Sequence, residues 1–441
     1  MAYNKAMKDF KPYLTNDGTI GLYNEEFDDI YHSATGALTE AYEKFIYPID
    51  FANLLKKDKI NVLDICYGIG YNSKSFLNYI FENFSKKNLN KNSSIETIYT
   101  NNNKTNNYSY IEKIHSNNIS EKSKNHYAYT DMIYPNNIFS KISVTAIDND
   151  KILSFLSPFI KTDIKNFYNK NLEFKYEKIE KYINAGKKNK SKLKINKLIN
   201  FLIYQKIAQN YPEIYQNTDI ISILGKKEYS PIFDKDIMGV FKRDKYKTGN
   251  KSLKKSKLPF LHNIYYQHVS NEYKKRLKAY NLQDINFNLQ IDDARQIIKK
   301  DNNLYNLIFL DAFTPTKCPC LWSLEFFTQL YNHLEDDGMI LTYVRSASVR
   351  NAMINAGFYI GEIYNERENK FTGTVATKNN ELIKYKLTEY DLGLLKTTAG
   401  IFYRDENLTD LNETIIERRN IEVKNSNIMS SSKYNKLHNK K

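Results

Sequence analysis

Cysteine is scarce in this sequence, and long apolar runs are missing. The 441 residues include three cysteines, Cys66, Cys318 and Cys320, too few for the disulfide framework of a small secreted domain. No run of about 18 consecutive apolar residues occurs, which argues against a membrane-spanning helix. The N-terminal stretch 1–14 lacks the apolar segment of a signal peptide. These absences predict a cytoplasmic protein with no membrane contact.

Positive charge, in contrast, is in excess. Lysine and arginine number 65 against 50 aspartate and glutamate residues, so the formal net charge is +15. A positive surface attracts polyanions such as tRNA and makes their binding depend on salt. The excess is nearly all lysine, however, and lysine is abundant together with asparagine, isoleucine and tyrosine, a mixture that also arises from compositional drift of a genome. Charge alone therefore leaves nucleic-acid binding open.

A strand, a glycine turn and a helix follow one another early in the chain. Residues 60–66 form a short apolar run with β-branched residues, and after glycines 68 and 70 the apolar positions 76, 77, 80, 81 and 84 have helical spacing. This order opens a doubly wound α/β fold.

Further strands are predicted at the end of a polar stretch and in the second half of the chain. The strand pattern returns before Asp148 and at 285–291, 306–313 and 338–344, with helical segments between, and two short segments near 361–379 suit a closing antiparallel pair. Five parallel strands that alternate with helices, closed by two more, match the Rossmann-like sheet of class I S-adenosylmethionine-dependent methyltransferases.

Two stretches interrupt this pattern and one follows it. Residues 85–140 are rich in asparagine, serine and lysine, and we expect a disordered, low-complexity insertion. Residues 151–284 read as a helical, lysine-rich insertion. The last residues, 421–441, show no core pattern and predict a basic disordered tail, so that 1–420 would form a single methyltransferase domain.

The first two predicted strands each deliver a carboxylate to the carboxyl edge of the sheet. Asp64 lies at the end of the first strand and could accept hydrogen bonds from an ammonium group, while Gly68 and Gly70 would let the backbone pass close to a ligand. A tight turn without a ligand explains the glycines equally well. Asp148 could hold two ribose hydroxyls, with Asp150 as an alternative and a solvated turn as the simpler explanation.

Two later strands repeat the arrangement. Asp292 or Asp293 could reach an adenine amino group, although Asp293 is also well placed to cap the helix that follows. Asp311 follows an apolar strand, and in the loop after it Phe313 and Trp322 could offer flat faces to a base or a sulfonium, unless they only pack in the core.

Metal chemistry has little support. Cys318 and Cys320 have the wrong spacing for a zinc knuckle, and the seven histidines form no cluster with cysteines, so no metal site is expected. Four acids at four strand ends instead suit a nucleoside with an amino-acid tail, which is S-adenosyl-L-methionine.

Several motifs, in the correct order, resemble the MnmC-like tRNA methyltransferases. They are N-E-E-F-D-D-I-Y-H-S-A-T-G-A-L-T-E-A-Y-E-K-F-I (24–46), C-Y-G-I-G-Y-N (66–72), F-L-D-A-F-T-P…P…L-W (309–322) and T-A-G-I-F-Y-R-D-E-N-L-T-D (398–410). The resemblance implies methylation of the amine of 5-aminomethyl(-2-thio)uridine at the wobble position, with S-adenosyl-L-methionine as cofactor and the tRNA anticodon loop as partner. It also implies the single-domain form, since no room remains after about residue 420 for the FAD-dependent oxidase domain of bifunctional members.

The resemblance also implies a role for each site residue. The methionine part of the cofactor would be held by Asp64, Gly68, Gly70 and Asn72, the ribose by Asp148, and the adenine by Asp292 or Asp293. Glu40 would line the cofactor site, and Asp311 would orient the reacting amine as the catalytic residue. Phe313, Trp322 and Tyr343 are candidates for stacking on the substrate base.

The motifs depart from the family in small ways. Asp64 stands where glutamate is usual, and Tyr67 replaces a frequent phenylalanine. With the ordinary aspartate pKa of about 3.9, Asp311 would be a poor base, so we expect it to position the amine more than to remove its proton.

Two other functions remain compatible with the sequence. An aminopropyltransferase of the spermidine-synthase type also has an acid after the fourth strand, but its G-G-G-D-G loop is absent, since residues 66–70 read C-Y-G-I-G. A non-catalytic, methyltransferase-like RNA-binding module is the third possibility, against which the four intact acids argue.

Overall fold

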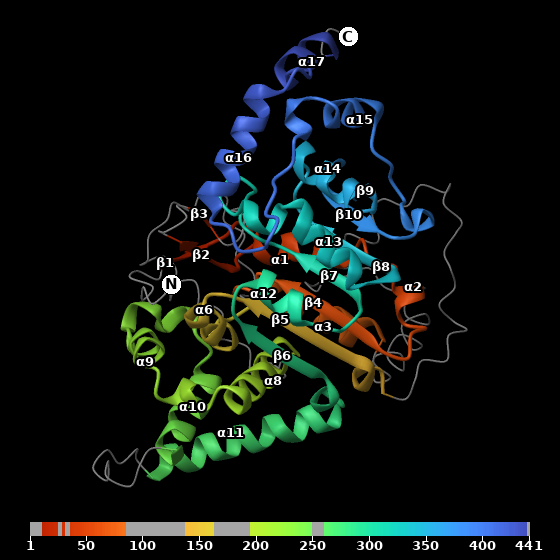
Figure 1. Cartoon of the computed structure of the whole chain (residues 1–441). Coiled ribbons are helices and arrows are strands. Elements are labelled where there is room, and N and C mark those ends of the chain that lie inside the picture. Colours follow the sequence, from red (N-terminus) through yellow and green to blue (C-terminus); the bar gives the residue numbers. More distant parts are fainter. Residues whose placement is uncertain are drawn as a thin grey trace, which may run out of the picture.

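A seven-stranded sheet forms the centre of the protein (Figure 1). The computed structural model describes residues 11–24, 29–30, 36–84, 137–162, 195–248 and 260–438. The strand order is β6-β5-β4-β7-β8-β10-β9. The strands are β4 (Ile60–Ile65), β5 (Ile142–Asp148), β6 (Asn286–Ile291), β7 (Tyr305–Leu310), β8 (Leu334–Thr342), β9 (Tyr359–Asn365) and β10 (Lys370–Thr377).

The pairing confirms the predicted methyltransferase sheet. β6, β5, β4, β7 and β8 pair in parallel, and β10 pairs antiparallel with both β8 and β9. β7 ends at Leu310, earlier than predicted, so residues 311–313 lie in the loop at the carboxyl edge. Parallel strands of this kind are buried on both faces and therefore read as continuous apolar runs, as β7 does at every position.

Helices cover both faces of the sheet. On one face, α3 (Tyr71–Phe84) and α8 (Ile195–Asn210) contribute to one core, which includes Val62 and Phe309. On the other face lie α12 (Ala294–Lys300), α13 (Leu324–Asn332) and α14 (Ala347–Asn355), whose core includes Leu63. Since Val62 and Leu63 are neighbours on β4, their side chains point to opposite faces of the sheet and belong to different cores.

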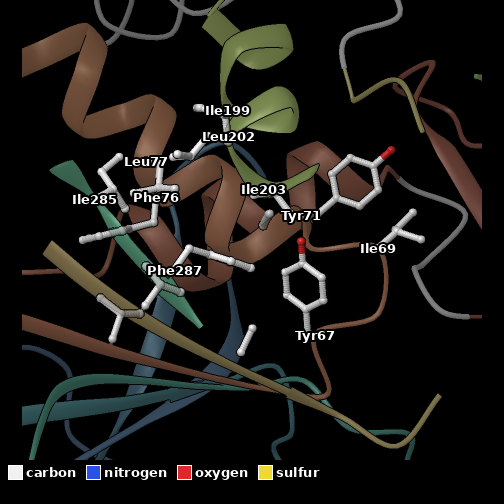
Figure 2. Packing of buried hydrophobic residues seen from close by; sticks show 14 of the residues in the cluster. Tyr67, Ile69, Tyr71, Phe76, Leu77, Ile199, Leu202, Ile203, Ile285 and Phe287 are labelled. Carbon is white, nitrogen blue, oxygen red and sulfur yellow. The ribbon is translucent and has the colours of Figure 1, made fainter. Parts of the chain in front are cut away.

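The helical insertion begins as part of the main core and then extends away from it. Figure 2 shows Ile199, Leu202 and Ile203 of α8 beside Leu77 of α3 and Phe287 of β6. The remaining helices are α6 (Lys151–Leu156), α9 (Thr218–Gly225), α10 (Lys235–Thr248) and α11 (Phe260–Ala279). The described parts of 151–284 are thus helical, as predicted; α8 is nevertheless a structural layer of the sheet rather than an appendage.

An N-terminal hairpin and a short helix pack against α3. The hairpin consists of β1 (Lys11–Leu14) and β2 (Ile20–Asn24), with the short β3 (Asp29–Ile30) beside it, and α1 (Ala37–Ala41), the π-helical turn η1 (Tyr42–Ile46) and α2 (Phe51–Leu54) follow. Asp17 in the hairpin turn accepts hydrogen bonds from the backbone N–H of Thr19 at 3.0 Å and of Thr39 at 2.8 Å. This aspartate therefore fixes α1, which carries Glu40, against the hairpin.

Two predictions of disorder need correction. Most of 85–140 lies outside the described residues, but its last part is ordered, because Ile138 and Phe139 are buried and Phe139 stacks on Phe81 at 6.3 Å.

The predicted tail is helical up to residue 438. It belongs to α16 (Asn412–Asn425) and α17 (Ser431–His438), which follow α15 (Glu389–Leu395). Buried Ile415 anchors α16 in the second core, and Tyr434 of α17 packs on Tyr390 with ring centres 5.6 Å apart. In the described residues no helix is long and apolar enough to cross a membrane.

Candidate active site

Three buried or half-buried carboxylates meet at the carboxyl edge of the sheet. Asp64 comes from β4, Asp148 ends β5, and Asp311 follows β7 directly. β4 lies between β5 and β7, so these acids belong to three adjacent strands. Their negative charges interact, since Asp148 and Asp311 both raise the pKa of Asp64.

Asp64 is the most deeply buried of the three. One carboxylate oxygen, Oδ2, accepts hydrogen bonds from the backbone N–H of Ser73 at 3.1 Å and from the Ser73 hydroxyl. The other, Oδ1, is buried without a hydrogen-bond partner among the described residues. Burial, together with the nearby acids, raises the pKa of Asp64 to about 8. An unpartnered buried carboxylate oxygen is costly and marks a position where a cationic donor would be favourable.

The glycine turn is shaped by positive backbone angles. φ is 56° at Gly68 and 80° at Gly70, a region that side chains rarely tolerate. The Gly68 N–H donates to Oδ2 of Asp148 at 2.7 Å. A Cβ atom at Gly70 would collide with the ring of Tyr67. Gly70 is thus required by packing, whereas Gly68 ties the turn to the acid of the next strand.

Asp148 is held by two backbone donors. Oδ2 accepts from Gly68, and Oδ1 accepts from the N–H of Asp150 at 2.8 Å. Burial first, and then the charge of Asp150, raise the pKa of Asp148 to about 7. Asp150 itself caps α6 by accepting from the N–H of Leu153 at 2.9 Å, which gives it a structural task.

Asp311 is coupled to the helix after the glycine turn and to the N-terminal segment. Asn72 Nδ2 donates to Oδ2 of Asp311 at 3.0 Å. Burial and the charge of Glu40 raise the pKa of Asp311 to about 7, although Asn72 and Lys44 act in the opposite direction. The predicted residues Glu40, Asn72 and Asp311, which are distant in sequence, therefore come together.

Sequence reasoning missed two lysines in this region. Lys44 of η1 forms an ion pair with Glu40, and its Nζ lies 5.4 Å from the ring centre of Tyr343. Lys74 is buried, and its Nζ donates to the carbonyls of Ile69 and Ser157 at 2.8 Å each, which fastens the glycine turn. The i, i+4 spacing of Glu40 and Lys44 was a usable signal, but the buried lysine had none in the sequence.

The two acids after β6 differ in their partners. Asp293 caps α12 by accepting from the N–H of Arg295 at 2.9 Å and pairs with the Arg295 guanidinium at 2.6 Å. Asp292 is exposed, and its own N–H donates to the carbonyl of Asp148 at 3.1 Å. Of the two, Asp292 is the one whose backbone is hydrogen-bonded to that of Asp148. In the described structure it has no ion pair, whereas Asp293 has one.

The three aromatic candidates also differ, in this case in how deeply they are buried. Trp322 is wrong as a stacking surface, because it is fully buried in the second core and its Nε1 donates to the carbonyl of Phe313 at 2.8 Å. Phe313 and Tyr343 are half-buried. The Tyr343 hydroxyl donates to the carbonyl of Ala312 at 2.8 Å, which places this tyrosine next to the loop that begins with Asp311.

Cys318 and Cys320 lie on the far part of the same loop. Their Sγ atoms are 3.7 Å apart. In the described part of the chain, no group of three or more histidine, cysteine or acidic residues could hold a metal ion.

Comparison with known proteins gives a consistent result. Residues 257–379 match a family of S-adenosyl-L-methionine-dependent methyltransferases. An uncharacterized protein of Methanocaldococcus jannaschii is 34% identical over 136 residues, which are 30% of this chain and 38% of that protein. The tRNA 5-methylaminomethyl-2-thiouridine biosynthesis bifunctional protein MnmC of Pseudomonas entomophila is 31% identical over 98 residues, 21% of this chain and 15% of that protein.

A solved structure extends the similarity of fold to nearly the whole chain. The crystal structure of MNMC2 from Aquifex aeolicus superposes with a TM-score of 0.50 and 16% identity over 96% of this chain and 87% of that one. The two relatives matched by sequence are aligned over less than two fifths of their own lengths, 38% and 15%. The family match covers the strands from β6 to β10, and the fold match extends over nearly the whole chain.

Proposed function

We propose that this chain, which belongs to the MnmC-like S-adenosyl-L-methionine-dependent methyltransferases, methylates the amine of 5-aminomethyl(-2-thio)uridine at the tRNA wobble position. The relatives named for 5-methylaminomethyl-2-thiouridine biosynthesis support this product. The observation that carries the proposal is the pair Asn72–Asp311, with its 3.0 Å hydrogen bond, beside the buried acids Asp64 and Asp148.

The acids fit a cofactor with a cationic amino-acid tail. Asp64 offers a buried oxygen, Oδ1, that lacks a hydrogen-bond donor in the described structure, and a methionine ammonium would supply one. Asp148 stands at the end of β5, where we expect it to bind the ribose hydroxyls, and exposed Asp292 to meet the adenine amino group. The turn at Gly68 brings backbone next to Asp148.

When bound, the cofactor supplies an electrophilic methyl group on a positive sulfonium. That charge favours the ionised forms of Asp64, Asp148 and Asp311, whose pKa values burial raises to about 8, 7 and 7. The three acids thus stabilise a cation that a neutral apolar pocket would exclude.

Asp311 then acts on the substrate amine. An alkylammonium has no free lone pair, so it must lose a proton before it attacks a methyl group. Asn72 engages Oδ2 of Asp311, and no hydrogen bond to Oδ1 is found among the described residues, so Oδ1 is the oxygen we assign to the amine. With its pKa raised to about 7, Asp311 is a more capable base than the ordinary value of about 3.9 implied. It would both accept the proton and orient the nitrogen.

The direct test is methyl transfer to tRNA that carries the free amine. The full chain, incubated with S-adenosyl-L-methionine and such tRNA, should convert 5-aminomethyluridine to 5-methylaminomethyluridine in digested nucleosides. A strain that lacks the gene should accumulate the amine. An unchanged nucleoside profile in that strain, together with no product in vitro, would refute the proposed function.

A further inference from the structure

The hairpin formed by β9 and β10 extends beyond the sheet at the edge that holds the site. β9 is antiparallel to β10, which is antiparallel to β8, so β9 ends at the same edge as the parallel strands. The last pair between β10 and β8 is Thr374↔Thr342, but pairing with β9 continues to Lys370↔Asn365. At about 3.3 Å per residue, the hairpin therefore projects about 10 Å further.

Three aromatic rings gather on this projection. Phe371 lies directly opposite Tyr364 with ring centres 5.3 Å apart, and the ring of Tyr385 is 5.3 Å from Tyr364 and 5.9 Å from Phe371. Tyr385 is 42% exposed. Its carbonyl accepts from the N–H of Glu362 at 2.8 Å, so the segment that carries Tyr385 runs along the outer edge of β9. The cluster is therefore fixed by backbone pairing, while Tyr385 stays partly exposed.

An arginine connects this cluster with the site. Arg345, two residues after Tyr343, donates to Oε1 of buried Glu362 at 2.6 Å, and its side chain is 42% exposed. Glu362 and Tyr364 are two positions apart on β9, so both side chains point to the same face of the sheet. Buried Arg350 pairs with Glu362 as well, at 2.9 Å. Glu362 Oε1 thus accepts hydrogen bonds from both arginines, and this contact holds Arg345 at the edge.

The hairpin tip itself is close to neutral. Arg367 pairs with Glu43 of η1 at 2.8 Å, and Lys370, whose side chain is 62% exposed, pairs with Glu368 at 2.7 Å. Glu366 adds one more negative charge. Long-range attraction by the tip is therefore weak, and any ligand must be recognised mainly by the rings and by Arg345. The ion pair to η1 also places the tip beside Lys44, which neighbours Glu43 and lies next to Glu40.

We propose that Arg345, Tyr364, Phe371 and Tyr385, here called the hairpin surface, bind the single-stranded loop of the RNA substrate. The inference rests on the proposed function and specifies where that substrate docks. Unpaired bases stack on aromatic rings. The guanidinium of Arg345 donates to Glu362 through Nε and Nη2, and its other terminal nitrogen can donate to a phosphate. A loop seated here would pass Tyr343 on its way to Asp311, because Tyr343 bonds the carbonyl of Ala312. RNA thus fits both the rings and their connection to the reacting group through Arg345 and Tyr343.

The strand offers a matched control for the test. Tyr359 is 51% exposed and begins β9, so it lies at the opposite edge of the sheet from Tyr385. The RNA probe is an anticodon stem-loop with a fluorescent label, and its affinity for the full chain is measured by anisotropy with S-adenosylhomocysteine present. Tyr385→Ala should weaken RNA binding by about 5- to 100-fold, the range for loss of one stacked base. Tyr359→Ala should leave it within about 2-fold of wild type.

A salt titration separates the two kinds of contact. Arg345→Gln should lower the slope of log affinity against log salt by about 0.7 to 1, as expected for one lost phosphate contact, whereas Tyr385→Ala should keep the slope. S-adenosylhomocysteine binding should stay unchanged in all three variants. Equal RNA affinities for Tyr385→Ala, Tyr359→Ala and wild type would overturn the inference. Normal RNA binding at this surface without methyl transfer would instead refute the proposed function and leave the inference standing.

Discussion

At the carboxyl edge of the sheet, β4, β5 and β7 lead into the acids Asp64, Asp148 and Asp311, whereas β8 and β9 lead into Arg345 and a partly exposed aromatic cluster. We call the first group the acidic half and the second the aromatic half. Both share one sheet and one edge of it. They differ in burial and in charge, since the acidic half is negative and the charges of the aromatic half are largely paired.

The difference in burial explains the difference in chemistry. Carboxylates that are removed from water and placed near one another resist ionisation, and their raised pKa values express this cost. A small cation such as S-adenosyl-L-methionine relieves the cost. The aromatic half needs no such relief, because its rings are partly exposed and Arg345 is paired with Glu362. A polyanion would meet less repulsion there than at the three buried acids, because the glutamates of this half are mostly paired with cations.

The sharpest challenge to this division is Asp311→Asn, since Asp311 lies between the halves. The asparagine side chain has nearly the size of aspartate and can still form a hydrogen bond with Asn72. It has no negative charge, however, and cannot act as a base. We expect single-turnover methyl transfer to fall by about 10²- to 10⁴-fold. The control is Asp336→Asn, because the Asp336 side chain is fully exposed on β8. Near-normal turnover in the Asp311 variant would withdraw the catalytic role.

The next effect in size concerns cofactor affinity in the acidic half. Asp148→Ala removes a buried carboxylate that we expect to hold the ribose, so S-adenosylhomocysteine binding should weaken by about 2–3 kcal/mol in calorimetry. Asp150→Ala, two residues away, removes the cap of α6 and a nearby charge but keeps the Asp148 carboxylate, so it should cost about 1 kcal/mol of stability with little loss of affinity. Similar affinities for the two variants, or tight binding of NAD instead, would contradict the cofactor assignment.

The acidic half was more predictable from the sequence than the aromatic half. An apolar strand that ends in an acid leaves a local pattern, so the sequence alone predicts Asp64, Asp148 and Asp311 at strand ends. The parallel order of these strands then follows from the fold class. The pattern does not reveal an environment, however: burial raises the pKa of Asp311 to about 7, which the ordinary value had not indicated.

The remaining features depend on contacts between distant segments. The ring cluster joins Tyr364, Phe371 and Tyr385 through a strand register and an edge segment that no local pattern specifies. Trp322 read as a possible stacking surface because the sequence does not show which face of a loop is buried. The end of the chain read as a disordered tail because its one deep anchor in α16, Ile415, and the contact of Tyr434 with Tyr390 are tertiary.

A smaller effect, also in the acidic half, is expected on the pH dependence of stability. Because the folded-state pKa of Asp64 is raised to about 8, the folded protein binds more protons than the unfolded chain between about pH 4 and pH 8. Stability without cofactor should therefore fall as pH rises through this window. Between pH 5.5 and 8.5, the free energy of unfolding measured in urea should fall by about 1–3 kcal/mol less for Asp64→Asn than for wild type. Parallel curves for the two proteins would show that Asp64 ionises freely.

The smallest expected effect distinguishes Asp292 from Asp293 at the outer strand of the acidic half. Asp293 caps α12 and pairs with Arg295, so Asp293→Ala should lower the free energy of unfolding by about 1 kcal/mol and leave S-adenosylhomocysteine affinity nearly unchanged. Exposed Asp292 is expected to accept a hydrogen bond from the adenine amino group, so Asp292→Ala should weaken binding by about 5-fold at unchanged stability.

A ligand change tests the same contact from the other side. S-inosylhomocysteine carries a carbonyl oxygen where the adenine has its amino group, so it cannot donate to a carboxylate. If Asp292 recognises the base, wild type and Asp293→Ala should both prefer the adenine ligand, whereas Asp292→Ala should bind the two ligands within about 2-fold of each other. Loss of this preference in Asp293→Ala, with Asp292→Ala still selective, would transfer the adenine contact to Asp293. It would also mean that the ion pair with Arg295 opens when the cofactor binds, since that carboxylate is otherwise engaged by the guanidinium.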